Sequence, residues 1–133
     1  MSEKTFNVYN NTNQAVRDAY ELLAANIYTN KYHKKLKTIV LTSCNPEEGK
    51  TTLAISLAIA MANSGWKVLL IDADMRKPAA AKRLYEGSQL GLSNYLSGEK
   101  ELHEVINPTN INNFNYLSSG SDHLNPIGLL SSV

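Results

Sequence analysis

The chain has 133 residues and a mass of 14.7 kDa, which is the size of one domain. Hydrophobic residues make up 43% and charged residues 19%, and this ordinary globular balance excludes an intrinsically disordered chain. The 13 basic and 12 acidic residues leave a net charge of +1, so charge gives no support for a nucleic-acid binder or a polybasic membrane binder. One cysteine, Cys44, excludes an internal disulfide, and we expect a cytoplasmic protein because no signal peptide or long apolar run is found.

Residues 1–37 are predicted to form an N-terminal helical segment. A polar capping sequence at residues 11–14 is followed by apolar residues that recur at helical spacing from Ala15 to Ile27. The pattern predicts an amphipathic helix, followed by a polar, basic connector.

Residues 38–133 are predicted to form an α/β domain. The β-branched run from Thr38 to Thr42 is typical of a buried parallel strand, and so is the run from Lys67 to Asp72. Between them, an apolar, alanine-rich stretch predicts a buried helix from about Lys50 to Ser64, which Gly65 ends. This order of elements indicates a βαβ unit in a doubly wound, mostly parallel sheet.

The rest of the chain predicts further elements of the same domain. Short helices are expected at residues 78–85 and 92–96, a third strand at residues 115–118, and a helix start at Asn125, where proline follows the cap residue. A helix with a start signal and no stop, after only three strands, is not typical of a finished α/β domain. We therefore expect the domain to be incomplete at its C-terminus.

The segment between the first strand and the buried helix has the composition of a phosphate-binding loop. Backbone N–H groups at a helix N-terminus bind anions, Gly49 lets the backbone approach closely, Lys50 can reach the β and γ oxygens of a nucleotide, and the Thr51 hydroxyl can bind Mg²⁺. The strict motif has a glycine at the position of Cys44. The predicted nucleotide-binding residues are Asn45, Glu47, Glu48, Gly49, Lys50, Thr51 and Thr52.

Two carboxylates and an arginine follow the second strand. Ligands of an open α/β sheet bind at the carboxyl ends of its strands, so Asp72 and Asp74 are expected on the same edge as the loop. We predict that Asp72, Asp74 and Thr51 hold Mg²⁺, and that Asp74 accepts a proton from an incoming hydroxyl. The predicted catalytic residues are Lys50, Asp72, Asp74 and Arg76. The alternatives are that Asp72 only caps a strand end and that Arg76 only pairs with a solvated Asp74.

The loop and the 68–78 segment together resemble the bacterial tyrosine kinases (BY-kinases) of capsule and exopolysaccharide synthesis. The resemblance continues through residues 91–98, Gly120 and the Asn125-Pro126 pair, and so covers nearly the whole chain. It implies a P-loop NTPase fold of the deviant Walker class, with Walker A at the loop and Walker A′ at Asp72. It also implies ATP/ADP and Mg²⁺ as cofactors, and an autophosphorylating kinase that transfers the ATP γ-phosphate to tyrosine.

The resemblance implies partners as well, and it has gaps. A membrane adaptor of the polysaccharide chain-length-regulator type and a tyrosine-containing protein substrate are implied, with recruitment to the inner face of the membrane. Glu47 stands where the family often has glycine, and Glu21 and Ala24 replace two arginines of its oligomerisation segment, which leaves a homo-oligomer open. A Walker B strand, implied to lie beside Thr38 to Thr42, and the tyrosine-rich tail have no match.

Two alternative functions remain. Partition and division-positioning ATPases carry a signature lysine where this chain has Asn45, which argues against them. A catalytically inactive nucleotide-binding partner of a polysaccharide export complex is the non-enzyme alternative.

Overall fold

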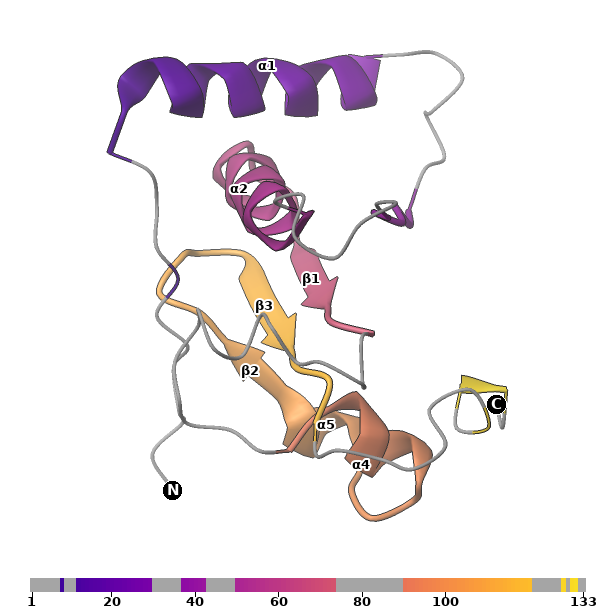
Figure 1. Ribbon diagram of the computed structural model, residues 1–133. Helices are drawn as coiled ribbons and strands as arrows, with labels where there is room; N and C mark the ends of the chain where they lie inside the picture. The colour runs from indigo at the N-terminus through magenta and orange to yellow at the C-terminus, as the bar shows by residue number, and fades with distance from the viewer. Residues whose placement is uncertain are drawn as a thin grey trace.

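The computed structural model describes residue 8 and residues 12–29, 37–42, 50–73 and 90–120, together with residues 128, 130 and 131; of Thr51 it describes the backbone alone. In these parts helix α1 (Gln14–Thr29) lies across helix α2 (Lys50–Asn63), and α2 packs on a small sheet (Figure 1). The layered α/β arrangement agrees with the predicted fold class.

The sheet has three strands in the order β1-β3-β2, and it is mixed. Strand β1 (Val68–Ile71) runs parallel to β3 (Phe114–Leu117), whereas β2 (Ile106–Pro108) pairs antiparallel with β3. Strands β1 and β3 confirm the strands predicted at residues 67–72 and 115–118, and β3 begins one residue earlier than expected. Strand β2 was not predicted, because a three-residue strand that ends in proline gives no strand signal of its own.

Helix α2 supplies one side of the main core. Its sequence is apolar nearly all round and predicts a mostly buried helix, and it buries Ile55, Ala58, Ile59 and Ala62 against Phe114 and Tyr116 of β3, with Val8 alongside. The predicted bounds differ from the observed ones by one residue. Because this helix fixes β1 and β3 beneath it, it also fixes the edge of the sheet where the predicted site residues begin.

Helix α1 is the predicted amphipathic helix, and it is capped at Asn13. The Asn13 Oδ1 atom accepts hydrogen bonds from the backbone N–H groups of Ala15 at 2.9 Å and Val16 at 3.4 Å. Ala24 is wholly buried in a second cluster with Leu57 and Ala60 of α2. A small side chain at position 24 therefore lets the two helices pack closely.

The predicted strand from Thr38 to Thr42 is wrong. Residues 37–42 are not assigned to a strand, and the sheet of the described residues contains no partner for them. Val40 is 83% exposed and Ile39 is 39% exposed. A strand requires hydrogen bonds to a neighbouring strand, so a β-branched sequence alone does not make one. The predicted βαβ unit consequently lacks its first strand here.

Two short helices follow β1 along the chain. Helix α4 (Leu92–Leu96) has the predicted bounds, and α5 (Leu102–Val105), which was not predicted, leads into β2. The helix expected at residues 78–85 and the helix start at Asn125 lie outside the described residues. Gly128 and Leu130, just beyond that start, are helical.

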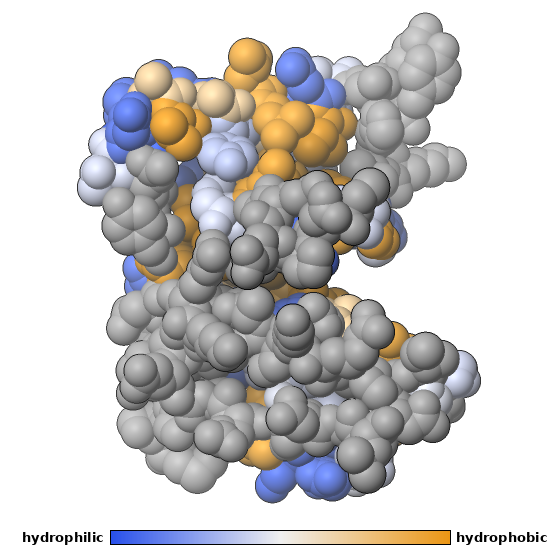
Figure 2. Space-filling model, viewed as in Figure 1, coloured by the Kyte–Doolittle hydropathy of each residue, from blue (hydrophilic) through white to orange (hydrophobic). Residues whose placement is uncertain are grey.

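Apolar side chains also reach the surface, and Figure 2 shows them over α1 at the top of the view. Leu22 and Leu23 of α1 are 63% and 40% exposed. Across the part of the chain that the structure describes, no helix is both long enough and apolar enough to cross a bilayer.

Candidate nucleotide site

Lys50 is the first residue of α2 and is half-buried. The first N–H groups of an α-helix have no partner within the helix, and the positive end of the helix dipole lies at the same terminus; both favour an anion at the start of the 14-residue α2. A cation at the same end adds to this field. Lys50 is therefore placed to bind a phosphate group that reaches the start of α2.

Asp72 directly follows β1, at the carboxyl end of that strand. Its backbone N–H donates a 2.9 Å hydrogen bond to the carbonyl oxygen of Leu117, the last residue of β3, and its Oδ2 atom is buried. The parallel pairing of β1 and β3 thus fixes the Asp72 backbone at the strand ends, where open α/β sheets bind ligands. This is the edge at which the sequence predicts Asp72.

Tyr116 lies on β3 beside this carboxylate and is wholly buried. Burial raises the pKa of the Tyr116 hydroxyl well above its ordinary value, and the negative charge of Asp72 raises it further. Tyr116 is accordingly a neutral neighbour of Asp72 throughout the physiological pH range.

A set of buried polar groups ties α4 to the residues that follow β3, and sequence reasoning did not predict it. The backbone N–H groups of Leu92 and Ser93 donate to the carbonyl oxygens of Ser118 and Ser119 at 2.8 and 3.0 Å. The Ser118 hydroxyl donates in turn to the carbonyl oxygen of Leu90 at 3.0 Å. These bonds hold the Ser118–Ser119 backbone at the end of β3, close to the strand end that carries Asp72.

Two glycines and an asparagine make this close contact possible. Asn94 Oδ1 accepts from the N–H of Gly91 at 2.9 Å, and Asn94 Nδ2 donates to Glu99 Oε2 at 2.9 Å. A Cβ on Gly91 would meet the Ser118 backbone, and one on Gly120 would meet the side chains of Ser93 and Asn94. The sequence signal for this contact was the pair Gly91, before α4, and Gly120, after β3. From the sequence alone, such glycines indicate only turns.

Most of the predicted site residues are not described. Those that lie outside the described residues are Asn45, Glu47, Glu48, Gly49, Asp74 and Arg76, and the Thr51 side chain joins them. Thr52 is exposed on α2. Within the described ranges, no three His, Cys, Asp or Glu side chains gather as metal ligands. Of the predicted site, the structure therefore gives the positions of Lys50 and Asp72, each at the end of its own element.

Comparison with known proteins gives a family. Residues 36–126 match the model of the AAA domain. The tyrosine-protein kinase YwqD of Bacillus subtilis is 35% identical over 115 residues, which are 86% of this chain and 48% of YwqD. The tyrosine-protein kinase CpsD of Streptococcus pneumoniae is 40% identical over 114 residues, or 85% of this chain and 49% of CpsD. The chain spans about half the length of these relatives.

Solved structures agree. The BceF tyrosine kinase domain superposes with a TM-score of 0.75 at 32% identity, covering 86% of this chain and 46% of that one. The chimerical protein CapA2B2 gives a TM-score of 0.74 at 27% identity and covers 94% of this chain and 58% of its own. The fold is thus that of bacterial tyrosine kinase domains, over about half of such a domain.

Proposed function

The chain belongs to the AAA-domain family of P-loop NTPases, and from this premise we propose that it forms the nucleotide-binding part of a bacterial tyrosine kinase domain. The observation that carries the proposal is the pairing of β1 with β3, which holds Asp72 at the carboxyl edge of the sheet, while Lys50 opens the helix that precedes β1. The reaction is transfer of the γ-phosphate of ATP to a tyrosine hydroxyl.

Each residue has a stated role in this proposal. Lys50 binds the β and γ phosphate oxygens, and the backbone N–H groups of Gly49 and its neighbours surround them. Asp72, Asp74 and the Thr51 hydroxyl hold Mg²⁺, which neutralises charge on the phosphates when it is bound. The place of Asp72 after β1, at the carboxyl end of the strand, supports this role, because ligands of open α/β sheets bind at that edge. Arg76 stabilises charge on the transferred phosphoryl group.

Asp74 is proposed as the base that accepts the proton of the incoming tyrosine hydroxyl. Asp74→Asn in a complete version of the protein should lower phosphotransfer by roughly 10² to 10⁴-fold and lower nucleotide affinity much less. A parallel loss of both would make Asp74 a metal ligand instead.

The partners and the location are part of the proposal as well. By its resemblance to the BY-kinases, the protein acts in the cytoplasm in capsule or exopolysaccharide synthesis. A membrane adaptor of the chain-length-regulator type recruits it to the inner face of the membrane, and its substrate is a tyrosine-containing protein. Ala24 of α1 is buried against α2 and carries no charge. Position 24 therefore offers no cation to a second copy, and ring assembly through it is not proposed.

The test separates nucleotide binding from chemistry. ATP binding is measured by titration with a fluorescent analogue, and ATP hydrolysis and tyrosine phosphorylation are assayed on the same sample. Binding with phosphorylation supports the kinase, and binding without either reaction supports the inactive partner. Binding with hydrolysis alone supports an ATPase of the partition type.

A further inference from the structure

Ser118 connects helix α4 to the peptide unit that holds the Asp72 backbone. Its hydroxyl donates a 3.0 Å hydrogen bond to the carbonyl oxygen of Leu90, and its own carbonyl oxygen accepts the N–H of Leu92 at 2.8 Å. The carbonyl group of Leu117 belongs to the peptide unit that ends at the Ser118 nitrogen, and its oxygen accepts the N–H of Asp72 at 2.9 Å. Ser118 is therefore bonded on one side to the start of α4 and on the other, through this peptide unit, to Asp72.

The connection between α4 and β3 is closely packed. Ser118 is 1% exposed, and a Cβ on Gly91 would come closer than 3.0 Å to both oxygen atoms of Ser118. Asn94 Oδ1 accepts the N–H of Gly91 at 2.9 Å, and the N–H of Ser93 donates to the carbonyl oxygen of Ser119 at 3.0 Å. Figure 1 shows α4 beyond the end of β3 to which the arrow points. The first turn of α4 and the end of β3 thus form one hydrogen-bonded unit.

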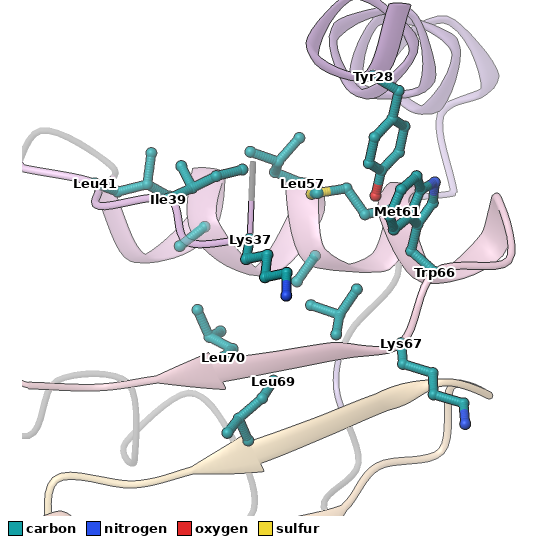
Figure 3. A pocket seen from close by; sticks show the side chains of 13 residues that line it. Tyr28, Lys37, Ile39, Leu41, Leu57, Met61, Trp66, Lys67, Leu69 and Leu70 are labelled. Carbon is teal, nitrogen blue, oxygen red and sulfur yellow. The ribbon is translucent and has the colours of Figure 1, made fainter. Parts of the chain in front are cut away.

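The side chain of Asp72 lies on the side of the sheet that faces α2. Figure 3 shows Leu70 on that side of β1, and Leu70 packs against the core cluster that α2 forms with β3. Side chains two residues apart along a strand lie on the same side, and the Asp72 N–H continues the β1–β3 ladder. Residues 64–67 alone connect the end of α2 to the start of β1, so the two elements are antiparallel and α2 begins, at Lys50, toward the carboxyl end of β1.

We propose that Ser118 is a positioning residue of the nucleotide site, which fixes the Leu117–Ser118 peptide and thereby holds the Asp72 carboxylate in place for Mg²⁺. The inference rests on the proposed function, because it takes Asp72 as a magnesium ligand. Mg²⁺ requires a nearly octahedral set of oxygen ligands, and the groups that orient a ligand control the affinity of its site. Lys50 is held by α2 and does not depend on this connection.

The neighbouring serine provides a matched control. Ser119 is buried like Ser118, but its hydroxyl has no hydrogen-bond partner among the described residues, whereas the Ser118 hydroxyl binds the carbonyl oxygen of Leu90. Ser119→Ala removes a buried hydroxyl without removing a hydrogen bond. Ser118→Ala removes the same atoms together with one hydrogen bond. A difference between the two variants therefore reports on the hydrogen bond and not on the lost volume.

The first test is amide hydrogen exchange of the full chain without nucleotide. Ser118→Ala should speed exchange of the Asp72 amide roughly three- to tenfold, as expected for the loss of one hydrogen bond. The Val68 amide donates to the carbonyl oxygen of Asn113 at the other end of β1, and its exchange should change less than about twofold. Ser119→Ala should leave both amides within about twofold of the parent. A general loss of stability would speed both amides alike; that result, or equal effects of the two serine variants, would overturn the proposal.

The second test measures the dissociation constant of ADP with Mg²⁺ and with EDTA. Ser118→Ala should raise it roughly three- to tenfold with Mg²⁺ and less than about twofold with EDTA, because Lys50 and the start of α2 bind phosphate without Asp72. Equal weakening in both conditions would make Ser118 a structural residue only and would overturn the proposal. A parent chain that binds no ADP in either condition would instead refute the proposed function, and the exchange test, which needs no nucleotide, would decide separately whether Ser118 holds Asp72.

The parent chain also supplies a test that needs no variant. Because coupling between two sites is reciprocal, ADP with Mg²⁺ should slow exchange of the Leu92 and Ser93 amides, which donate to the carbonyl oxygens of Ser118 and Ser119, at least about threefold more than ADP with EDTA does. Both samples are compared at saturating ADP, with the Val68 amide as the internal control. Equal protection with and without Mg²⁺ would overturn the proposal even if Ser118→Ala did not fold.

Discussion

Gly91 lies directly against the backbone of Ser118, so that a Cβ at position 91 would come closer than 3.0 Å to the Ser118 carbonyl oxygen. The N–H of Leu92 donates to that same oxygen at 2.8 Å. The φ angle of Gly91 is −167°, which any residue adopts. Glycine is therefore required here for space and not for backbone conformation.

Gly91→Ala should accordingly destabilise the fold by overpacking. We expect the free energy of unfolding to fall by about 1–3 kcal/mol, as for other insertions of a methyl group into a closely packed site. Urea denaturation measures it as a lower midpoint with an unchanged slope. Lys100→Ala, on the exposed turn after α4, is the control and should stay within about 0.5 kcal/mol of the parent. A Gly91→Ala protein as stable as this control would show that α4 can move away from β3.

Lys50→Ala should remove most of the nucleotide affinity. A charged hydrogen bond to phosphate in a half-buried site contributes about 1.5–3 kcal/mol, so we expect the dissociation constant to rise roughly 10- to 150-fold. Titration with a fluorescent ATP analogue measures this, with circular dichroism to verify the fold. Lys67→Ala is the matched control, because Lys67 is an exposed lysine at the opposite end of β1 from Asp72. Equal affinity in parent and Lys50→Ala would remove Lys50 from the site.

The raised pKa of Tyr116 predicts that the free energy of unfolding falls at alkaline pH. Its folded-state pKa is raised above the ordinary value of 10.0, so the unfolded chain loses the proton first as pH rises. The stabilisation is fully present below pH 10 and is lost above it, by at most about 1.4 kcal/mol per pH unit. Tyr116→Phe should flatten this part of the stability curve, measured by urea denaturation between pH 8 and about 11. Tyr95→Phe, at an exposed position of α4, should leave the slope as in the parent.

The elements that local sequence decides were predictable. The alanine-rich run of α2 and the apolar run of β1 have signals within their own residues, and both form within one residue of the predicted bounds. Residues 38–42 have an equally strong β-branched signal, yet they form no strand, because pairing depends on a neighbour far away in the sequence. Strand β2 is the reverse case: its own residues have a weak β propensity, and it forms a strand because it pairs with β3.

The candidate site divides in the same way. Asp72 was predicted from its place after a buried strand, and its position at the end of β1 confirms that placement, while its role as a metal ligand stays a prediction. The contact of Gly91 with Ser118 joins residues that are 27 positions apart, and no sequence motif around either residue predicts that they meet. Tertiary packing alone reveals why each residue is there.

The last prediction concerns Tyr28 and Trp66, which stack with ring centroids 4.0 Å apart and an interplanar angle of 8°. This contact joins the end of α1 to the residues that follow α2. Stacked aromatic pairs contribute about 0.5–1.5 kcal/mol beyond the area they bury. A double-mutant cycle of Tyr28→Ala and Trp66→Ala should give a coupling energy in this range.

The Tyr28 hydroxyl separates stacking from hydrogen bonding in the same pair. Its oxygen is buried and has no hydrogen-bond partner among the described residues, and burial raises the pKa of Tyr28 to about 12. Tyr28→Phe keeps the stack and removes a buried polar atom, so we expect it to be neutral or to stabilise by up to about 1 kcal/mol. Trp66 is the one tryptophan of the sequence, so its fluorescence reports on this contact directly. Emission should shift to longer wavelength in Tyr28→Ala and stay unchanged in Tyr28→Phe. If Tyr28→Phe instead lost stability as Tyr28→Ala does, the hydroxyl and not the ring stack would hold α1 against α2.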